Sequence, residues 1–149
     1  DLDLFKQVND DHGHAIGDEI LRQAAGRMRF ITRDCDTVAR LGGDEFVVLL
    51  TEVANEASCV AAVERLIDGL TSPYRVNGIT IEVGASMGVA MSPVHGHDID
   101  TLLHRADQAL YSVKRDAARR YAVWAPELEK LGGAPRITFE SPPSDPSDR

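Results

Sequence analysis

The sequence has few cysteines and a shortage of positive charge. Cys35 and Cys59 are the only cysteines among 149 residues, and their spacing fits no disulfide framework, so we expect two reduced thiols in a cytosolic domain. Lys and Arg number 16 against 24 Asp and Glu, giving a net charge of −8. This balance argues against broad affinity for nucleic acid or for an anionic membrane. A site for a polyanionic nucleotide would therefore need a metal ion and local positive groups.

Long apolar runs are also missing. No stretch approaches the roughly 18 apolar residues that a membrane span needs, and no signal peptide is visible. Hydrophobic residues nevertheless make up 43 % of the chain, enough for the core of one ordinary domain. The first residue is Asp1 and not Met, so we expect a fragment whose upstream sensor or membrane segment lies outside this sequence.

Apolar periodicity predicts three long amphipathic helices. The first begins near Gly17, the second follows Asn55 as its N-cap, and the third covers Ile99 to Val113 with Leu102, Leu103, Ala106 and Leu110 facing inward. Before the first of them, a short helix near residues 2–8 is expected to end in a polar loop over residues 9–14.

Strands are predicted between these helices. Residues 38–41 and 46–50 flank Gly42-Gly43 and form a β-hairpin, and a second hairpin turns at Asn77-Gly78. Residues 79–91 alternate bulky and small side chains as one long strand, and residues 121–124 form a last edge strand. The expected fold class is α+β, a central and mostly antiparallel sheet flanked by helices.

The composition changes near the C-terminal end. Five of the seven prolines lie at or after Pro126, together with Ser and Asp. We therefore predict a globular domain over residues 1–124 and a Pro/Ser-rich linker or disordered tail over residues 125–149.

Several short blocks occur together in one order along the chain. Residues 40–46 read Arg-Leu-Gly-Gly-Asp-Glu-Phe in the predicted hairpin, preceded by Asp-Leu-Asp-Leu-Phe-Lys at residues 1–6 and by His-Ala-Ile-Gly-Asp at residues 14–18. Residues 85–90 and 106–111 add a later strand and helix. From residue 1 to about residue 124 the sequence resembles the GGDEF domain family of diguanylate cyclases, whose fold is similar to a nucleotide-cyclase or polymerase palm.

The resemblance implies a metal site for Mg²⁺ (or Mn²⁺) and a catalytic centre. The metal would be held by Asp1, by the carbonyl of Leu2 and by Asp44, while Glu45 binds a second metal or assists deprotonation. Divalent ions suit this chemistry because they neutralise phosphates and bridge nucleophile and leaving oxygens. Taken alone, acidic turn residues are as readily explained as solvated side chains.

The same resemblance implies contacts to GTP. The main-chain N–H groups of Leu4 and Phe5 and the side chain of Lys6 would face the phosphates at a helix start, with Lys6 stabilising transition-state charge. Gly42 and Gly43 permit close approach of backbone N–H groups to phosphate, although an ordinary tight turn uses the same residues. Further along the chain, Lys114 matches a triphosphate-contacting lysine.

Guanine would be read by Asn9 and Asp18, since a carboxylate accepts from the N1–H and N2–H₂ groups. A loop asparagine and a helix-start aspartate are the rival interpretation. Arg33 and Asp36 fit the family's RxxD product-inhibition site, where cyclic di-GMP would bind; the alternative is a charged helix end.

Two departures from the family pattern stand out. The family's opening helix and most of its first strand lie outside this sequence, which starts at Asp1. Ala118 occupies a position where the family carries an arginine, although Arg119 follows it directly.

The function implied is a diguanylate cyclase that condenses two GTP into cyclic di-GMP and releases pyrophosphate. The reaction's two-fold symmetry implies a homodimer, with an upstream sensor domain and no nucleic-acid partner. The alternative is a non-catalytic regulatory module that binds GTP or cyclic di-GMP. A fold-related nucleotide cyclase or polymerase palm fits the guanine and RxxD blocks less well.

Overall fold

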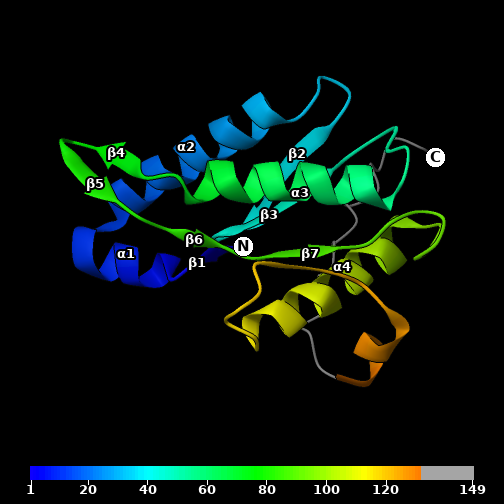
Figure 1. Cartoon of the computed structure of the whole chain (residues 1–149). Helices are drawn as coiled ribbons and strands as arrows, with labels where there is room; N and C mark the ends of the chain where they lie inside the picture. Colours follow the sequence, from blue (N-terminus) through cyan, green and yellow to red (C-terminus); the bar gives the residue numbers. More distant parts are fainter. Residues whose placement is uncertain (132–149) are drawn as a thin grey trace, which may run out of the picture.

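The computed structural model describes residues 1–131 (Figure 1). Four α-helices lie within this range: α1 Phe5–His12, α2 His14–Ile31, α3 Glu56–Thr71 and α4 Ile99–Lys114. The strands are β1 Leu2–Asp3, β2 Thr37–Gly42, β3 Glu45–Leu49, β4 Tyr74–Val76, β5 Ile79–Ile81, β6 Gly84–Ala85, β7 Met87–Val89 and β8 Tyr121–Val123. A 3₁₀ helix, η1, covers Pro126–Leu131.

The strands pair two by two. β1 pairs with β6, β2 with β3, and β4 with β5, all antiparallel, whereas β7 and β8 are parallel. Both predicted hairpins and the last strand are confirmed, and so is the α+β class with mostly antiparallel pairing.

Side-chain caps fix the starts of two helices. Asn55 accepts a hydrogen bond from the Ser58 N–H at 2.9 Å at the start of α3, as predicted, and Asp98 accepts from the Thr101 N–H at 2.8 Å at the start of α4. Each cap satisfies one of the N–H groups that the first helical turn leaves without a partner. The opposite end of α3 is held by Arg27, which donates to the carbonyls of Gly69 and Pro73.

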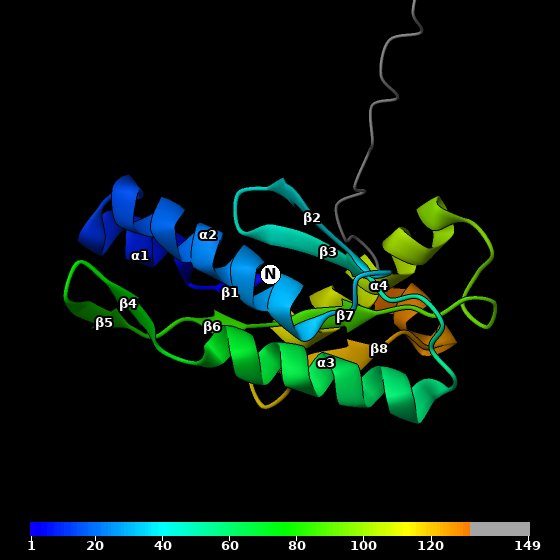
Figure 2. The ribbon, with the colours of Figure 1, turned by 90° about the horizontal axis from the view of Figure 1, so that it is seen from above.

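The helices lie on both sides of the strand layer. In Figure 1 the strands β1, β6 and β7 cross the middle of the molecule, with α2 and α3 on one side and α4 on the other. Seen from above, α2 and α3 run close to each other (Figure 2). The main core joins buried residues of the two helices to strand residues, among them Leu2, Ile20, Met28, Leu66 and Tyr74.

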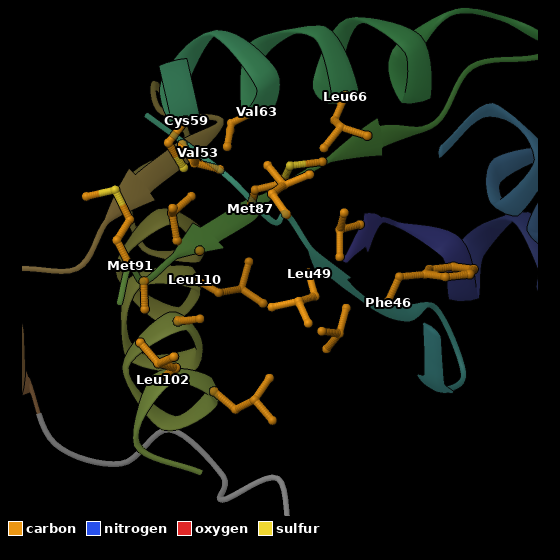
Figure 3. Close-up of a pocket in the computed structure, with 18 of the residues that line it drawn as sticks. Phe46, Leu49, Val53, Cys59, Val63, Leu66, Met87, Met91, Leu102 and Leu110 are labelled. Atoms are coloured by element: carbon orange, nitrogen blue, oxygen red, sulfur yellow. The ribbon is translucent and has the colours of Figure 1, made fainter. Parts of the chain in front are cut away.

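Two sequence-based predictions need correction. The polar stretch 9–14 is not a loop: α1 continues to His12 and α2 begins at His14, so Gly13, with φ of 85°, is the whole connection. The run 79–91 is divided among β5, β6 and β7. The inward-facing residues predicted for α4 are partly buried and line an apolar groove between β3 and β7 (Figure 3): Leu102, Leu103, Ala106 and Leu110. The fully buried residues of α4 are Ala109 and Val113.

Residues 126–131, the first part of the predicted tail, form η1. η1 packs on α4, and Leu128 contacts the small core cluster that contains Ala109, Val113 and Trp124. The rest of the predicted tail, from residue 132 on, lies outside the described residues. Within residues 1–131 no helix has the length and apolar character needed to cross a membrane.

Candidate active site

The tip of the β2–β3 hairpin presents two acidic residues. Gly43 has φ of 52°, a conformation that favours glycine, and its carbonyl accepts from the Arg40 Nε at 2.9 Å. A register shift between Arg40 and Gly42 completes the tight tip, which places Asp44 half-buried and Glu45 exposed at the start of β3.

The hairpin tip lies against the first strand. The Leu2 N–H donates to the main-chain carbonyl of Asp44 at 3.3 Å, which brings residues 1–3 next to the glycine turn although 42 positions separate Leu2 from Asp44. The two acidic segments that the sequence predicts to share a metal are thus neighbours through their backbones.

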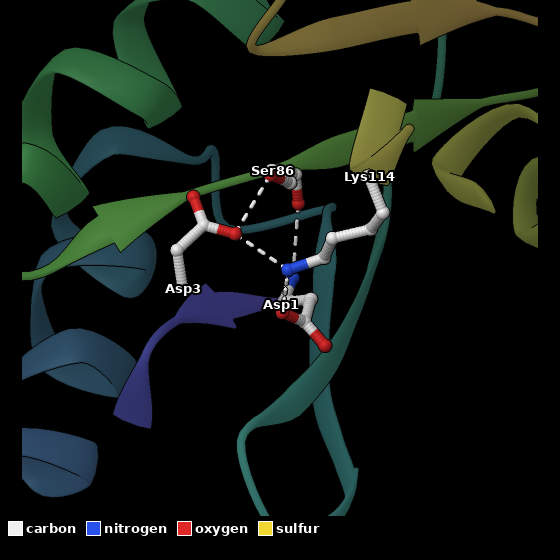
Figure 4. A network of polar contacts seen from close by, with 4 residues as sticks. All are labelled: Asp1, Asp3, Ser86 and Lys114. Carbon is white, nitrogen blue, oxygen red and sulfur yellow. Dashed lines mark hydrogen bonds and ion pairs between the residues drawn. The ribbon is translucent and has the colours of Figure 1, made fainter. Parts of the chain in front are cut away.

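A lysine ammonium group lies between the carboxylates of Asp1 and Asp3. The Lys114 ammonium, from the end of α4, forms ion pairs with the carboxylates of Asp1 and Asp3 (Figure 4). Asp3 also accepts from the Ser86 hydroxyl at 2.8 Å. The main-chain nitrogen of Asp1 donates to the Ser86 carbonyl at 3.1 Å.

One residue separates the end of β1 from the start of α1, and the N–H groups of the first turn of α1 have no partner within the helix. Leu4 precedes the helix in the left-handed conformation, with φ of 59° and a side chain that is 75 % exposed. Phe5 is buried and anchors the first turn, whereas Lys6 is exposed. A left-handed leucine costs free energy, and such strain is concentrated at functional sites.

Asn9 lies against the first turn of α2. A Cβ built on Gly17 would fall 1.9 Å from the Asn9 Oδ1, so the absence of a side chain at Gly17 lets the two helices meet at this point. Asp18 is the next residue and is exposed. The predicted pair of guanine readers therefore comes from adjacent positions of α1 and α2.

Asp36 stabilises the turn of the RxxD segment through hydrogen bonds to main-chain N–H groups. It is 7 % exposed and accepts hydrogen bonds from the N–H groups of Arg33 at 2.8 Å and Thr51 at 2.9 Å. These hydrogen bonds, that of Thr51 first, hold the pKa of Asp36 below its usual range. Arg33 is exposed, so its guanidinium is accessible, and the product-binding role of the two residues stays a prediction.

Arg119 and Arg120, which follow α4, pair with carboxylates away from β1. The Arg119 Nε pairs with the Asp116 carboxylate at 3.2 Å, and the Ala118 N–H donates to the same side chain. Arg120 lies 3.7 Å from Asp68 on α3. Lys114, the last residue of α4, is therefore the basic residue that pairs with the carboxylates of Asp1 and Asp3.

Three polar residues of this region were not predicted as site residues. Asp3 and Ser86 form the network around Lys114, and their signal in the sequence was no more than their position inside the matching blocks. Asp107 on α4 has a buried Oδ2 without a hydrogen-bond partner among the described residues, and burial raises its pKa.

Comparison with known proteins identifies the family to which this chain belongs. The family model described as diguanylate cyclase, GGDEF domain, matches residues 1–120. The diguanylate cyclase TpbB of Pseudomonas aeruginosa is 42 % identical over 125 residues, covering 82 % of this chain and 29 % of that protein. The cyclic di-GMP phosphodiesterase PdeR of Escherichia coli is 35 % identical over 130 residues, covering 87 % of this chain and 20 % of PdeR.

Solved structures agree. The GGDEF domain of TpbB superimposes with a TM-score of 0.82 at 37 % identity, covering 88 % of this chain and 77 % of that one. The GGDEF domain of DgcB from Caulobacter crescentus, solved in complex with c-di-GMP, gives a TM-score of 0.70 at 27 % identity, covering 85 % and 74 %. The chain spans less than a third of the length of the two curated relatives. Its match over residues 1–120 shows that the chain belongs to the GGDEF domain family of diguanylate cyclases.

Proposed function

We propose that this chain is the catalytic domain of a diguanylate cyclase, which joins two GTP molecules into cyclic di-GMP and releases pyrophosphate. The observation that carries the proposal is that two acidic segments, distant along the chain, meet. The Leu2 N–H donates to the Asp44 carbonyl, and the carboxylate of the neighbouring Asp1 pairs with the Lys114 ammonium. Such a convergence supports a reaction whose main difficulty is the negative charge of the phosphates.

The residues present fit a divalent ion. Within residues 1–131 no three His, Cys, Asp or Glu side chains gather into a metal cluster, and Mg²⁺ commonly uses only one or two carboxylates together with substrate phosphates and water. Asp1, Asp44 and the carbonyl of Leu2 would hold it. When bound, Mg²⁺ or Mn²⁺ supplies charge neutralisation to the triphosphate and activates the 3′-hydroxyl that attacks the α-phosphate.

The chain's own residues orient the nucleotide. The N–H groups that open α1, at Leu4 and Phe5, and the exposed ammonium of Lys6 bind the β- and γ-phosphates. Lys114, which pairs with the carboxylates of Asp1 and Asp3, would contact the triphosphate once the nucleotide is bound. Asn9 and Asp18 read the guanine edge from the junction of α1 and α2, where Gly17 leaves room for Asn9.

Each domain holds one GTP, and two domains meet face to face in a homodimer because each 3′-hydroxyl attacks the other nucleotide. The test is to incubate the natural protein with GTP and Mg²⁺ and to separate the products by chromatography. We expect cyclic di-GMP and pyrophosphate from GTP and no cyclic product from ATP. A folded, nucleotide-binding protein that forms no cyclic di-GMP would instead support the regulatory module.

Replacing Gly43 with alanine tests the phosphate role of the hairpin tip. Space is open around this residue, so a Cβ meets nothing within 4 Å and the structural cost is confined to the φ of 52°, about 1–2 kcal/mol. We expect the KM for GTP to rise at least about tenfold, because the methyl group stands where phosphate approaches. Titration with GTP and thermal unfolding separate the two effects; a loss of stability with unchanged KM would indicate an ordinary turn.

Product inhibition is assigned to Arg33 and Asp36. DgcB, a relative with this fold, was solved in complex with c-di-GMP, and Arg33 is exposed beside a rigid turn held by Asp36. Arg33→Ala should leave the initial rate of synthesis unchanged and raise the inhibitory concentration of cyclic di-GMP about tenfold or more, since a bidentate, charge-assisted contact is lost. Arg65→Ala, an exposed arginine on α3, is the matched control. Unchanged inhibition in Arg33→Ala would remove this assignment.

A regulatory role is the second candidate. It is favoured by the similarity to PdeR, a phosphodiesterase, and by Ala118, which stands where the family carries an arginine, while the neighbouring Arg119 pairs with Asp116. In that case the domain binds GTP or cyclic di-GMP without chemistry.

A further inference from the structure

The loop between β7 and α4 contains a single buried side chain. This loop covers residues 90–98 and lies at the edge of the molecule in both views (Figures 1 and 2). Within residues 90–108 the one buried residue is His95, which is 8 % exposed, whereas Val94 beside it is 76 % exposed. Between Met91 and the start of α4, the imidazole of His95 therefore holds the loop to the domain.

The main chain of Met91 fixes the protonation state of the His95 ring. The His95 N–H donates to the Met91 carbonyl at 2.6 Å, and the His95 Nδ1 accepts from the Met91 N–H at 3.1 Å. A ring nitrogen accepts a hydrogen bond only when it carries no proton, so the buried ring is neutral, with its hydrogen on Nε2. Protonation of Nδ1 would set two donors against each other and leave the Met91 N–H without its acceptor.

The His95 ring also packs on Trp124. The two ring centroids lie 5.4 Å apart with an angle of 64° between the planes, an edge-to-face contact. Trp124 is buried and joins two elements, because its main-chain N–H donates to the Val89 carbonyl at the end of β7 and its Nε1 donates to the Gln108 Oε1 on α4. His95 thus closes the loop over the residue that connects β7 to α4.

Trp124 supports η1 as well. Leu128 of η1 packs on the small core cluster that contains Trp124. The Arg105 guanidinium lies 4.1 Å from the centre of the Trp124 ring and pairs with the Glu129 carboxylate of η1 at 3.5 Å. The β7–α4 loop and η1 therefore share one anchor.

We propose that His95 makes this anchor sensitive to pH: the neutral ring keeps the β7–α4 loop packed on Trp124, and protonation releases the loop and loosens η1. Release is local, because the residues on either side of His95 are already at the surface, and a small movement of the loop brings an imidazolium into water. The inference does not depend on the proposed function, since none of these residues belongs to the proposed nucleotide site.

The surroundings of His95 set the direction of the pH dependence. Burial and, after it, the positive charge of Arg105 on α4 lower the pKa of His95, while Glu56 at the start of α3 acts in the opposite direction. In the released loop the pKa of a histidine is about 6.5. The closed loop therefore binds the proton more weakly than the released one. Loop closure is most favourable above about pH 6.5, and its equilibrium constant falls up to about tenfold per pH unit below that, until the closed loop is itself protonated.

The other charged groups of the loop do not produce the same transition. Asp98 caps α4, and its hydrogen bonds from Thr101 hold the pKa of Asp98 below its usual range, so it stays charged in the range where histidine titrates. His97 is exposed on the same loop, and His104 is exposed on α4. These two histidines serve as internal references for His95.

Tryptophan fluorescence tests the proposal directly, because Trp124 is the only tryptophan among the 149 residues. The chain is titrated from about pH 8 to about pH 5, the range in which histidine changes its charge. We expect a reversible one-proton transition with a midpoint below about 6.5, a red shift of the emission, and acrylamide quenching that rises at least about threefold as the indole becomes accessible. Far-UV circular dichroism should stay constant. A loss of helical signal with the same midpoint would indicate global unfolding and would overturn the proposal.

Two substitutions in the loop assign the transition to one residue. His95→Gln removes the titrating group and keeps an oxygen that can accept from the Met91 N–H, so the fluorescence should no longer change with pH and Trp124 should stay protected. His97→Gln is the matched control and should leave the midpoint unchanged. A transition that persists in His95→Gln, or one that is lost in His97→Gln, contradicts the assignment.

Nuclear magnetic resonance of the unsubstituted chain gives a measurement that needs no variant. The Cε1 proton of His95 should titrate at lower pH than those of His97 and His104, and the protection factor of the Met91 amide against hydrogen exchange should fall over the same range. A His95 ring that titrates with or above the exposed histidines, or an unchanged Met91 protection factor, would also overturn the proposal. If His95→Gln does not fold, this measurement decides alone.

Discussion

Asp44→Asn is expected to lower cyclic di-GMP synthesis about 1,000-fold or more. Under the proposed function Asp44 is the hairpin-tip ligand of the metal that Asp1 and Leu2 also hold, and a metal ion contributes several kcal/mol of stabilisation to the charged transition state. A loss of about 4 kcal/mol corresponds to a factor of about 1,000 in rate. The measurement is the initial rate with saturating GTP and Mg²⁺, followed by chromatography of the products.

The variant should remain folded. Asp44 contacts β1 through its main-chain carbonyl, which accepts from the Leu2 N–H, and asparagine preserves both that bond and the side-chain shape. Thermal unfolding should therefore change little. Glu64→Gln, an exposed acid on α3, is the control for loss of one negative charge and should retain full activity. Synthesis by Asp44→Asn at a rate near that of the natural protein would remove the metal assignment.

Gly88→Ala should destabilise the domain by about 3 kcal/mol or more. A Cβ at this position would lie 1.9 Å from the Ala106 carbonyl oxygen and 2.4 Å from the Leu110 nitrogen. Both are main-chain atoms of α4, so no side-chain rotation relieves the overlap, and the helix has to move away from β7. For a domain of this size we expect the melting temperature to fall by roughly 10 °C.

Gly26→Ala is the matched control, because the same substitution is expected there to raise the free energy of unfolding and not to lower it. Gly26 lies within α2, and a Cβ there meets nothing within 4 Å. Alanine should stabilise the helix by about 0.5–1 kcal/mol. Thermal and denaturant unfolding of the two variants, side by side, measure the difference. A Gly88→Ala domain as stable as the natural one would show that α4 does not pack on β7 as described.

Local signals predicted much of the fold. The hairpin around Gly42-Gly43, the turn at Asn77-Gly78 and the cap at Asn55 all depend on short-range chemistry, and all three are present. The stretch 9–14 was wrongly predicted as a loop, because polar residues also suit the exposed faces of helices, and one glycine at position 13 suffices to join α1 to α2.

Long-range arrangement was less accessible. The apolar face of α4 was visible in the sequence, but periodicity does not say which neighbour covers each side chain, and Leu102 and Leu110 line the groove while Ala109 is buried. Asp3, Ser86 and Asp107 acquire their surroundings only through packing of segments that are distant along the chain. The named roles of the site residues came from the family resemblance and stay predictions.

The ion pair between Asp1 and Lys114 joins positions 113 residues apart. Closing so long a loop costs more chain entropy than forming the local hairpins or the contact of α1 with α2. We therefore expect the carboxylates and the lysine to meet after the local helices and hairpins have formed. Under the proposed function, a nascent or partly unfolded polypeptide would lack an assembled reaction centre, so cyclase activity would require a completely folded domain.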